Sequence, residues 1–288
     1  MATLVELFTD EQVETFHRDG FLVVEDGLIP ESALERLRDR YLRVFEGDYE
    51  TGIRPDEVNW VPGKDPADRT RQVCNAWKSD TVIAAQVLSA RIGRLAAQLM
   101  GYAGVRILQD NVLWKPPGTK AIGFHQDGSY ADYLVPPQMV TCWMSLHDTQ
   151  ADAGPIAYVR GSNHWPRTPP ERTQFHAPED WLAGARAAKP DDAEIDVVPV
   201  EVRAGGGAFH HDLTFHGSEP NTSGTVARMA LVSHLLPSHA RFHDRNVDVV
   251  YSRYRRHGDT AMDESFFPIL WDVTGYRTPW LAELPQLD

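Results

Sequence analysis

Two histidines and one aspartate have the types and spacing needed to hold a metal ion. His125 and Asp127 are two positions apart, so on a β-strand both side chains project from the same face. His216 follows His125 by 91 residues, a separation expected if a second strand crosses beside the first in a closed sheet. Two imidazoles and one carboxylate leave the other positions of the ion open, as non-haem Fe(II) requires when it also holds a co-substrate and O₂.

Arg228 is a candidate anchor for a carboxylate. It follows His216 by 12 residues and would return on the next strand. Its guanidinium is a planar fork of N–H donors that matches the two oxygens of a carboxylate. An ion-paired or surface arginine on the same strand is the alternative.

A second His-x-Asp pair, His210 and Asp212, tests the choice of metal ligands. With 12 histidines in the chain, such a pair can arise by chance. His216 lies only four residues beyond Asp212, and glycines like Gly123 and Gly128, which flank the first pair, are absent. We therefore predict that the first pair binds the metal and that His210 is a strand residue near the substrate.

The ordered set of His125, Asp127, His216 and Arg228 resembles the signature of the phytanoyl-CoA dioxygenase family, within the Fe(II)/2-oxoglutarate-dependent oxygenases. Further stretches resemble family blocks in the same order: residues 8–12, 19–22, 111–117, 124–128, 154–164 and 216–221. The similarity covers roughly residues 8–240. An ordered set of blocks is far more specific than one short motif.

This resemblance implies a double-stranded β-helix, the cupin-like jelly roll, with helices packed on one face. It also implies Fe(II) as the metal, with 2-oxoglutarate and O₂ as co-substrates. The far carboxylate of 2-oxoglutarate is expected at Arg228 and Ser218, and Asn111 and Trp143 are expected near the same co-substrate. Ser218 could equally be a turn hydroxyl, and Trp143 an ordinary core residue.

The implied reaction oxidises a C–H bond of the substrate while 2-oxoglutarate becomes succinate and CO₂. Hydroxylation is the expected outcome, and no residue separates it from cyclisation, epimerisation or desaturation. Related halogenases replace the metal-binding carboxylate by a small residue, so Asp127 disfavours halogenation. A Zn-dependent hydrolase or a non-catalytic jelly-roll binding protein is the alternative, since two histidines and a carboxylate also hold zinc. Arg228 and Asn111 favour the oxygenase over the hydrolase, because a hydrolase needs no dicarboxylate pocket.

The substrate is expected to be a small or mid-sized, largely apolar or aromatic metabolite, as in the secondary metabolism of many bacterial relatives. Gln109, Trp77, Tyr130 and His210 are its candidate contacts. Residues 166–199 lack periodicity and form a candidate lid or substrate loop. A CoA thioester is disfavoured, since no basic cluster for its phosphates is evident.

The strand predicted over residues 105–114 carries polar side chains on a mainly apolar face. Alternation places Gln109, Asn111 and Leu113 on the same face as Val105 and Ile107. Buried amides need partners, so Gln109 and Asn111 either satisfy each other and the backbone or line a polar cavity.

The other elements follow from apolar periodicity and capping signals. We predict strands over residues 21–24, 139–146, 156–159, 197–202, 208–216 and 226–236, and helices over 10–19, 30–47 and 80–101. On strand 139–146, Thr141, Trp143 and Ser145 share one face. One domain is expected: a helical part over residues 9–101, a jelly-roll core over about 105–237 and an extension over 238–288 whose role is not readable.

Composition limits the partners and the compartment. The 288 residues carry a formal net charge of −13, which argues against a nucleic-acid-binding surface. No secretory signal and no apolar run of about 18 residues is evident, so we expect a cytoplasmic protein without a membrane span. Two cysteines are too few for a disulfide framework or a thiolate metal site. The oligomeric state stays open.

Overall fold

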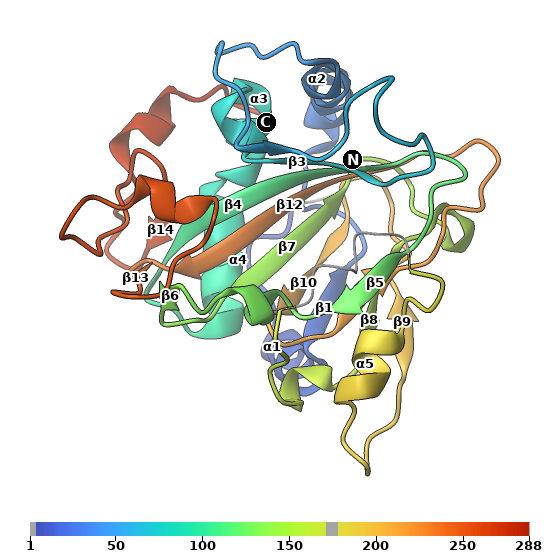
Figure 1. The fold of residues 1–288 in the computed structure, drawn as a ribbon. Helices are drawn as coiled ribbons and strands as arrows, with labels where there is room; N and C mark the ends of the chain where they lie inside the picture. Colours follow the sequence, from blue (N-terminus) through green and yellow to red (C-terminus); the bar gives the residue numbers. More distant parts are fainter. Residues whose placement is uncertain (1–3, 171–177, 288) are drawn as a thin grey trace.

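The computed structural model describes residues 4–170 and 178–287, and it is mainly antiparallel β, as predicted (Figure 1). The larger sheet has eight strands: β1 (Phe21–Val24), β10 (Gly207–His211), β7 (Val140–Ser145), β12 (Arg228–Pro237), β4 (Gly104–Lys115), β3 (Arg71–Cys74) and β2 (Glu57–Val58) in that order, with β14 (Ile269–Asp272) also paired to β4. The smaller sheet has four: β5 (Ile122–His125), β11 (His216–Ser218), β8 (Ile156–Val159) and β9 (Val197–Pro199). A separate pair joins β13 (Arg241–Phe242) to β6 (Leu134–Val135).

Helices cover one face of the larger sheet. They are α1 (Asp10–Asp19), α2 (Leu34–Glu46), α3 (Thr81–Val87) and α4 (Ala90–Met100), and α4 packs across β4, β7 and β12. The capping box predicted at the start of α1 is present, with Thr9 accepting from the backbone of Gln12. The single helix predicted over residues 80–101 is wrong. Asp80 caps α3, and the extended backbone of Ser89 separates α3 from α4.

The main hydrophobic core lies between these helices and the sheet. Leu37, Leu95, Val112, Leu231 and Phe209 are among its fully buried members. A second apolar cluster, around Trp143 and Tyr158, joins side chains of the larger sheet to side chains of the smaller one. The two sheets are therefore held face to face, and the space between them is the place for a ligand site.

Because β4 contains a bulge, Gln109, Asn111 and Leu113 do not share a face with Val105 and Ile107, contrary to the prediction. Gln109 pairs with His234 and Ile107 with Leu235, so Leu108 is an extra residue on its strand. An extra residue reverses the alternation of side chains beyond it. Ile107 consequently packs in the main core, whereas Leu108 and Gln109 face the space between the sheets.

The strand predicted over residues 208–216 is two strands in different sheets. β10 ends at His211 in the larger sheet, and β11 begins at His216 in the smaller one. The backbone N–H of Thr214 bonds to the carbonyl of His211, forming a turn between them. This crossing carries the chain from one sheet to the other within a few residues.

The remaining elements are short, and several lie beyond the jelly-roll strands. They are the 3₁₀ helices η1 (Glu31–Ala33), η2 (Ala76–Lys78), η3 (Asp127–Tyr130), η4 (Ala151–Ala153), η5 (Ser162–His164), η7 (Tyr251–Tyr254) and η8 (Pro279–Glu283), and the helix α5 (Ala183–Ala188). Within the candidate lid over 166–199, α5 and β9 are regular, and residues 171–177 lie outside the described part. No helix in the described ranges is long and apolar enough to cross a membrane.

Candidate metal and co-substrate site

Three side chains from the smaller sheet and its edge form a cluster with metal-ligand geometry. His125 on β5 and His216 on β11 are directly opposed in register, with ring centroids 4.3 Å apart. Asp127 Oδ1 lies 3.9 Å from His125 Nε2 and 3.5 Å from His216 Nε2. One ligand atom from each residue lies within 4.8 Å of the others. Asp127 is not on the strand as predicted, because β5 ends at His125 and Asp127 begins η3.

Both histidines are oriented to offer Nε2. The Nδ1 of His125 bonds to the carbonyl of Gly123 at 2.9 Å, and the Nδ1 of His216 bonds to the carbonyl of Thr214 at 3.0 Å. These bonds place the ring proton on Nδ1, so Nε2 keeps its lone pair. Burial lowers the pKa of both imidazoles to about 4, which keeps them neutral at physiological pH. Two neutral imidazoles and a carboxylate suit a divalent transition metal such as Fe(II).

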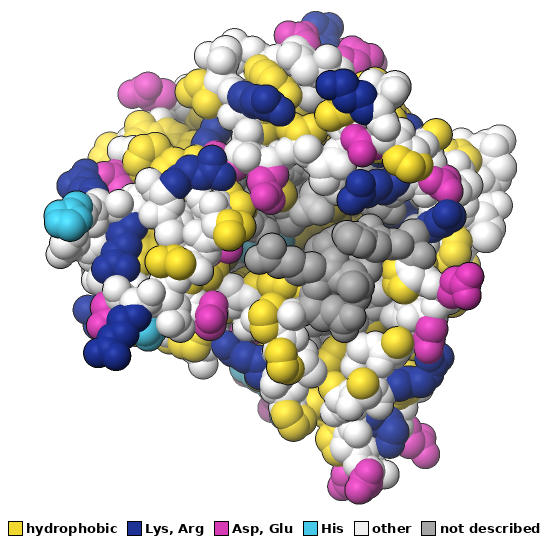
Figure 2. Space-filling model, in the orientation of Figure 1, with side chains coloured by type: hydrophobic (Ala, Val, Ile, Leu, Met, Phe, Trp, Pro, Cys, Tyr) yellow, Lys and Arg dark blue, Asp and Glu magenta, His cyan; other side chains and the backbone are white. Residues whose placement is uncertain are grey.

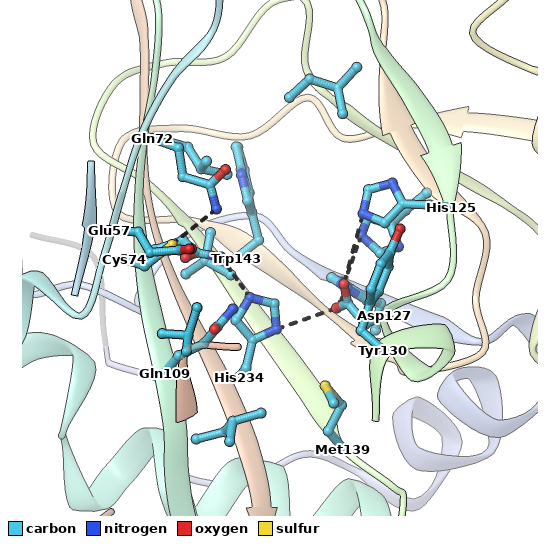
Figure 3. Close-up of a pocket in the computed structure, with 18 of the residues that line it drawn as sticks. Glu57, Gln72, Cys74, Gln109, His125, Asp127, Tyr130, Met139, Trp143 and His234 are labelled. Atoms are coloured by element: carbon cyan, nitrogen blue, oxygen red, sulfur yellow. Dashed lines mark hydrogen bonds and ion pairs between the residues drawn. The ribbon is translucent and has the colours of Figure 1, made fainter. Parts of the chain in front are cut away.

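The other carboxylate oxygen of Asp127 faces the larger sheet. Its Oδ2 accepts a hydrogen bond from Thr141 Oγ1 at 2.8 Å and lies 3.1 Å from His210 Nε2. His234 Nδ1 lies 3.4 Å from the same oxygen, and Figure 3 shows His234 pointing from the sheet toward Asp127. The two oxygens of this carboxylate therefore face different surroundings.

A cavity of about 380 Å³ opens between the sheets beside this cluster. Its wall includes Asn111, Trp143, Arg228, Val232 and His234 from the larger sheet and Ser218 from the smaller one. The rest of the wall is largely apolar and aromatic, with Leu108, Tyr130, Tyr133, Met139, Val250 and Tyr251. On β12, Arg228 and His234 point into the cavity six positions apart, so they line different depths of it.

Some buried polar atoms in the cavity wall have no hydrogen-bond partner among the described residues. They include Arg228 Nε, Trp143 Nε1 and Asn111 Oδ1. Burial lowers the pKa of Arg228 to about 10, which leaves the guanidinium charged at neutral pH. Because burying an unpaired charge costs several kcal/mol, the two donors among them, Arg228 Nε and Trp143 Nε1, fit a carboxylate ligand, whereas Asn111 Oδ1 is an acceptor. The donor set matches 2-oxoglutarate bound between Arg228 and the metal cluster.

Ser218 lines the cavity next to a residue that sequence analysis did not single out. Lys115 Nζ donates to Ser218 Oγ at 2.7 Å and also to the carbonyl of Glu219. Lys115 is completely buried, and burial together with the charge of Arg228 lowers its pKa well below 10.5. Its N–H donors fix the Ser218 hydroxyl, whose own hydrogen is free to point toward a ligand.

The predicted substrate residues are not all in the cavity. Gln109, Tyr130 and His210 line it. Gln109 accepts a hydrogen bond from Tyr251, so it does not satisfy Asn111, and both amides line the cavity. Trp77 does not line it, because its indole stacks on Trp280 and donates to Asn75. The structure therefore does not bring Trp77 together with the other predicted substrate residues.

Sequence reasoning missed three residues of the site: Thr141, which bonds to Asp127, and His234 and Tyr251, which line the cavity. Thr141 was placed on the same strand face as Trp143 without a role, and alternation along β12 places His234 on the face of Arg228. Tyr251 comes from the extension over 238–288, so this segment builds part of the cavity wall. Alternation could have flagged the first two, whereas Tyr251 follows no periodic pattern.

Comparison with known proteins agrees with this geometry. The family model described as phytanoyl-CoA dioxygenase (PhyH) matches residues 16–230. Among solved structures, the non-heme alpha ketoglutarate dependent carbocyclase SnoK from nogalamycin biosynthesis is 25% identical, with a TM-score of 0.71 over 91% of this chain and 96% of that one. The epimerase SnoN, in complex with Fe3+, alpha ketoglutarate and nogalamycin RO, is 19% identical, with a TM-score of 0.69 over 91% and 98%.

A third structure, EvdO2 from Micromonospora carbonacea var. aurantiaca complexed with 2-oxoglutarate, is 19% identical, with a TM-score of 0.60 over 85% and 97%. A search of curated proteins found no match. The predicted cupin-like jelly roll is confirmed, and the chain is an oxygenase of the non-haem iron, 2-oxoglutarate-dependent class. It belongs to the phytanoyl-CoA dioxygenase family, whose model matches well over half of its length.

Proposed function

We propose that this protein oxidises a C–H bond of a mid-sized, largely apolar or aromatic metabolite, with hydroxylation as the simplest outcome. Iron is held by His125, Asp127 and His216, and 2-oxoglutarate is anchored by Arg228 with Ser218, Asn111 and Trp143 around it. The observation that carries this proposal is the metal-ligand cluster opening into the same cavity as a buried arginine with an unpartnered Nε.

The dicarboxylate pocket favours this function over its alternatives. Catalytic zinc in a hydrolase needs an open site for water but no deep cation for a second carboxylate. Arg228 is 3% exposed and forms no ion pair with the described residues, so an anion that enters the cavity would compensate its charge. A non-catalytic binding protein would not need two histidines and an aspartate with ligand atoms within 4.8 Å of one another beside that pocket.

The chain's residues orient the reactants and exclude water. When bound, iron and 2-oxoglutarate would supply the oxidising power, and the keto acid would be decarboxylated to succinate and CO₂ in the same reaction. Arg228 fixes the far carboxylate of 2-oxoglutarate by charge-assisted hydrogen bonds, and Lys115 holds the Ser218 hydroxyl beside it. Trp143, fully buried, contributes an apolar wall beside Arg228.

The proposed substrate class follows from the other residues of the cavity wall. Tyr130, Tyr133, Tyr251, Leu108 and Met139 offer apolar and aromatic contacts. Among the described residues that line the cavity, Arg228 is the only Lys or Arg, and it is committed to the co-substrate. Basic and acidic side chains are interspersed on the face shown in Figure 2. These observations, with the likeness to SnoK, support a metabolite of secondary metabolism over a CoA thioester.

The test measures turnover and metal content together. We expect Fe(II)-loaded protein with 2-oxoglutarate to consume O₂ and form succinate, faster when a panel of aromatic polyketides and terpenoids includes a substrate. Phytanoyl-CoA, included in the panel as an acyl-CoA, should not accelerate O₂ consumption or succinate formation. Replacing His125, Asp127 or His216 by Ala should weaken iron binding strongly and abolish succinate formation, because each variant loses one of the three protein ligands.

The product of an accelerating substrate, identified by mass and NMR, distinguishes hydroxylation from ring closure, epimerisation and desaturation. The Lys120→Met variant, which alters only an exposed ion pair with Asp68, is a matched control and should behave as wild type. Stoichiometric iron in His216→Ala protein, or hydrolysis without O₂ consumption, would contradict the proposal.

A further inference from the structure

We propose that His210, Thr141 and His234 form a transverse clamp that holds Asp127 Oδ2 and so reserves Oδ1 for the metal. This inference rests on the proposed function, because it takes Asp127 as an iron ligand. It assigns positioning roles to Thr141 and His234, which sequence analysis left without one, and a different role to His210, which was expected near the substrate.

The clamp follows from strand register. In the larger sheet β10, β7 and β12 are neighbours, and Thr141 on β7 is directly opposite His210 on one side and His234 on the other. The three side chains therefore form one row across the sheet. All three are buried, and their nearest polar atoms lie 2.8 to 3.4 Å from Asp127 Oδ2.

A partner behind each histidine sets the direction of its hydrogen bond. The hydroxyl of Tyr158 lies 3.0 Å from His210 Nδ1, and burial raises the pKa of this phenol well above 10, so it is protonated and donates. His210 then carries its proton on Nε2, facing Asp127. Asn111 Nδ2 lies 2.9 Å from His234 Nε2, and as a donor it places the proton of His234 on Nδ1.

The resulting chain of donors ends on one oxygen. His234 Nδ1 donates to Thr141 Oγ1 at 3.0 Å, and the Thr141 hydroxyl donates to Asp127 Oδ2 at 2.8 Å. His210 Nε2 donates to the same oxygen at 3.1 Å. With Oδ2 occupied by these donors, Asp127 can offer only Oδ1 to an ion. A carboxylate that binds through one oxygen leaves more of the metal open for 2-oxoglutarate and O₂.

The central test is Thr141→Val, which keeps the shape of the side chain and removes the hydroxyl. Anaerobic titration with Co(II), followed by its ligand-field absorption, and competition with Fe(II) should show a dissociation constant raised roughly ten- to a hundredfold. The Co(II) spectrum should also change, because the freed carboxylate can rotate to bind through both oxygens. Thr141→Ser restores the hydroxyl and should restore both affinity and spectrum.

The matched control is Ser233→Ala, which removes a buried hydroxyl on β12 that bonds to Val87 on the helical side of the sheet. It should leave affinity and spectrum at wild-type values. If Thr141→Val fails to fold, as judged by thermal melting, Tyr158→Phe removes only the donor behind His210. It should raise the dissociation constant by a smaller factor and shift the same spectrum.

The outcomes separate this inference from the proposed function. Wild-type affinity and an unchanged spectrum in Thr141→Val, or in Tyr158→Phe where that variant replaces it, would overturn the clamp. If His216→Ala still loses the metal in that case, the ligand assignment stands and only the clamp is wrong. Retention of the metal by His216→Ala would instead remove the basis of both.

Discussion

Arg228 is a cation almost entirely withdrawn from water at the deep end of the cavity. It is 3% exposed, and its Nε has no hydrogen-bond partner among the described residues. The ring centroid of Trp143 lies 5.8 Å from its guanidinium carbon. A contact of that length compensates little of the cost of burial. The residue is therefore arranged to gain far more from an anionic ligand than an exposed arginine would.

This arrangement predicts the effect of Arg228→Lys on 2-oxoglutarate. Lysine keeps the charge but loses the planar fork, so one charge-assisted hydrogen bond is lost. Such bonds contribute about 1.5–3 kcal/mol, which corresponds to a roughly ten- to hundredfold weaker apparent affinity. Titration of the metal-to-ligand absorption band of the anaerobic Fe(II) protein with 2-oxoglutarate measures this.

Arg228→Ala should cost more and should admit a keto acid without the far carboxylate, such as pyruvate, because that ligand leaves no charge unpaired. Iron binding in the absence of 2-oxoglutarate is the internal control and should persist in both variants. Equal 2-oxoglutarate affinity in wild type and both variants would show that the dicarboxylate is anchored elsewhere.

The strand β4 directs side chains into two different environments, one on each face of the larger sheet. Asn111 faces the cavity, whereas its neighbour Asp110 faces the helical side of the sheet. The Oδ1 of Asp110 accepts from the backbone N–H of Trp77 at 3.0 Å, and its Oδ2 has no partner. Burial raises the pKa of this carboxyl from 3.8 to about 7. The strand therefore carries an acid that the fold prefers to keep protonated.

Asp110 should make stability fall as pH rises. Its raised pKa means that the folded state binds a proton more tightly, so its contribution is complete below about pH 4 and is lost between about pH 4 and 7. A shift of this size corresponds to on the order of 4 kcal/mol. Asp110→Asn, which cannot ionise, should be more stable than wild type at pH 8 and lose the advantage near pH 4.

Urea unfolding at several pH values between 4 and 8 provides the measurement. The variant keeps an oxygen acceptor for the Trp77 N–H, so a change in pH slope reports ionisation rather than a lost hydrogen bond. A slope identical to that of wild type would mean that Asp110 does not titrate in this range.

For the whole molecule, a buried polar cluster joins parts of the chain that are far apart in sequence. Lys78 Nζ bonds to Asp56 Oδ2 at 2.7 Å and to the hydroxyl of Tyr254 at 2.8 Å, and Tyr254 also donates to Asp56. The side chains of Lys78 and Asp56 are 9% and 7% exposed. This cluster attaches the segment that carries Tyr251 to the strands that form the opposite wall of the cavity.

Lys78→Met should destabilise the protein by about 3 kcal/mol or more, because it leaves the carboxylate of Asp56 buried without its cation. The free energy of unfolding from urea titration measures this. Asp56→Asn combined with Lys78→Met should recover part of the loss, since no uncompensated charge remains. Lys120→Met, which removes an exposed pair, should change stability by less than about 1 kcal/mol. Equal losses in the buried and exposed pairs would contradict this account.

Sequence alone predicted most strands and the residues of the metal cluster, because alternation and the ordered motifs are local signals. It could not predict which strands pair, and the donors around Asp127 depend on that pairing. Thr141 was predicted to share a strand face with Trp143, yet only register places it between His210 and His234. The bulge at Leu108 was also invisible, because one extra residue changes no composition or period that sequence reasoning can detect.

The crossing from β10 to β11 limits how this chain can change in length during evolution. Four residues, from Asp212 to Phe215, separate the strand that carries His210 from the strand that begins with His216. Inserting or deleting one residue there would turn His216 to the opposite face of its strand. Connecting segments at the mouth of the cavity can change in length without that penalty, because they do not set the face to which a metal ligand points. New substrates are therefore more readily acquired by changing these segments than by altering this crossing.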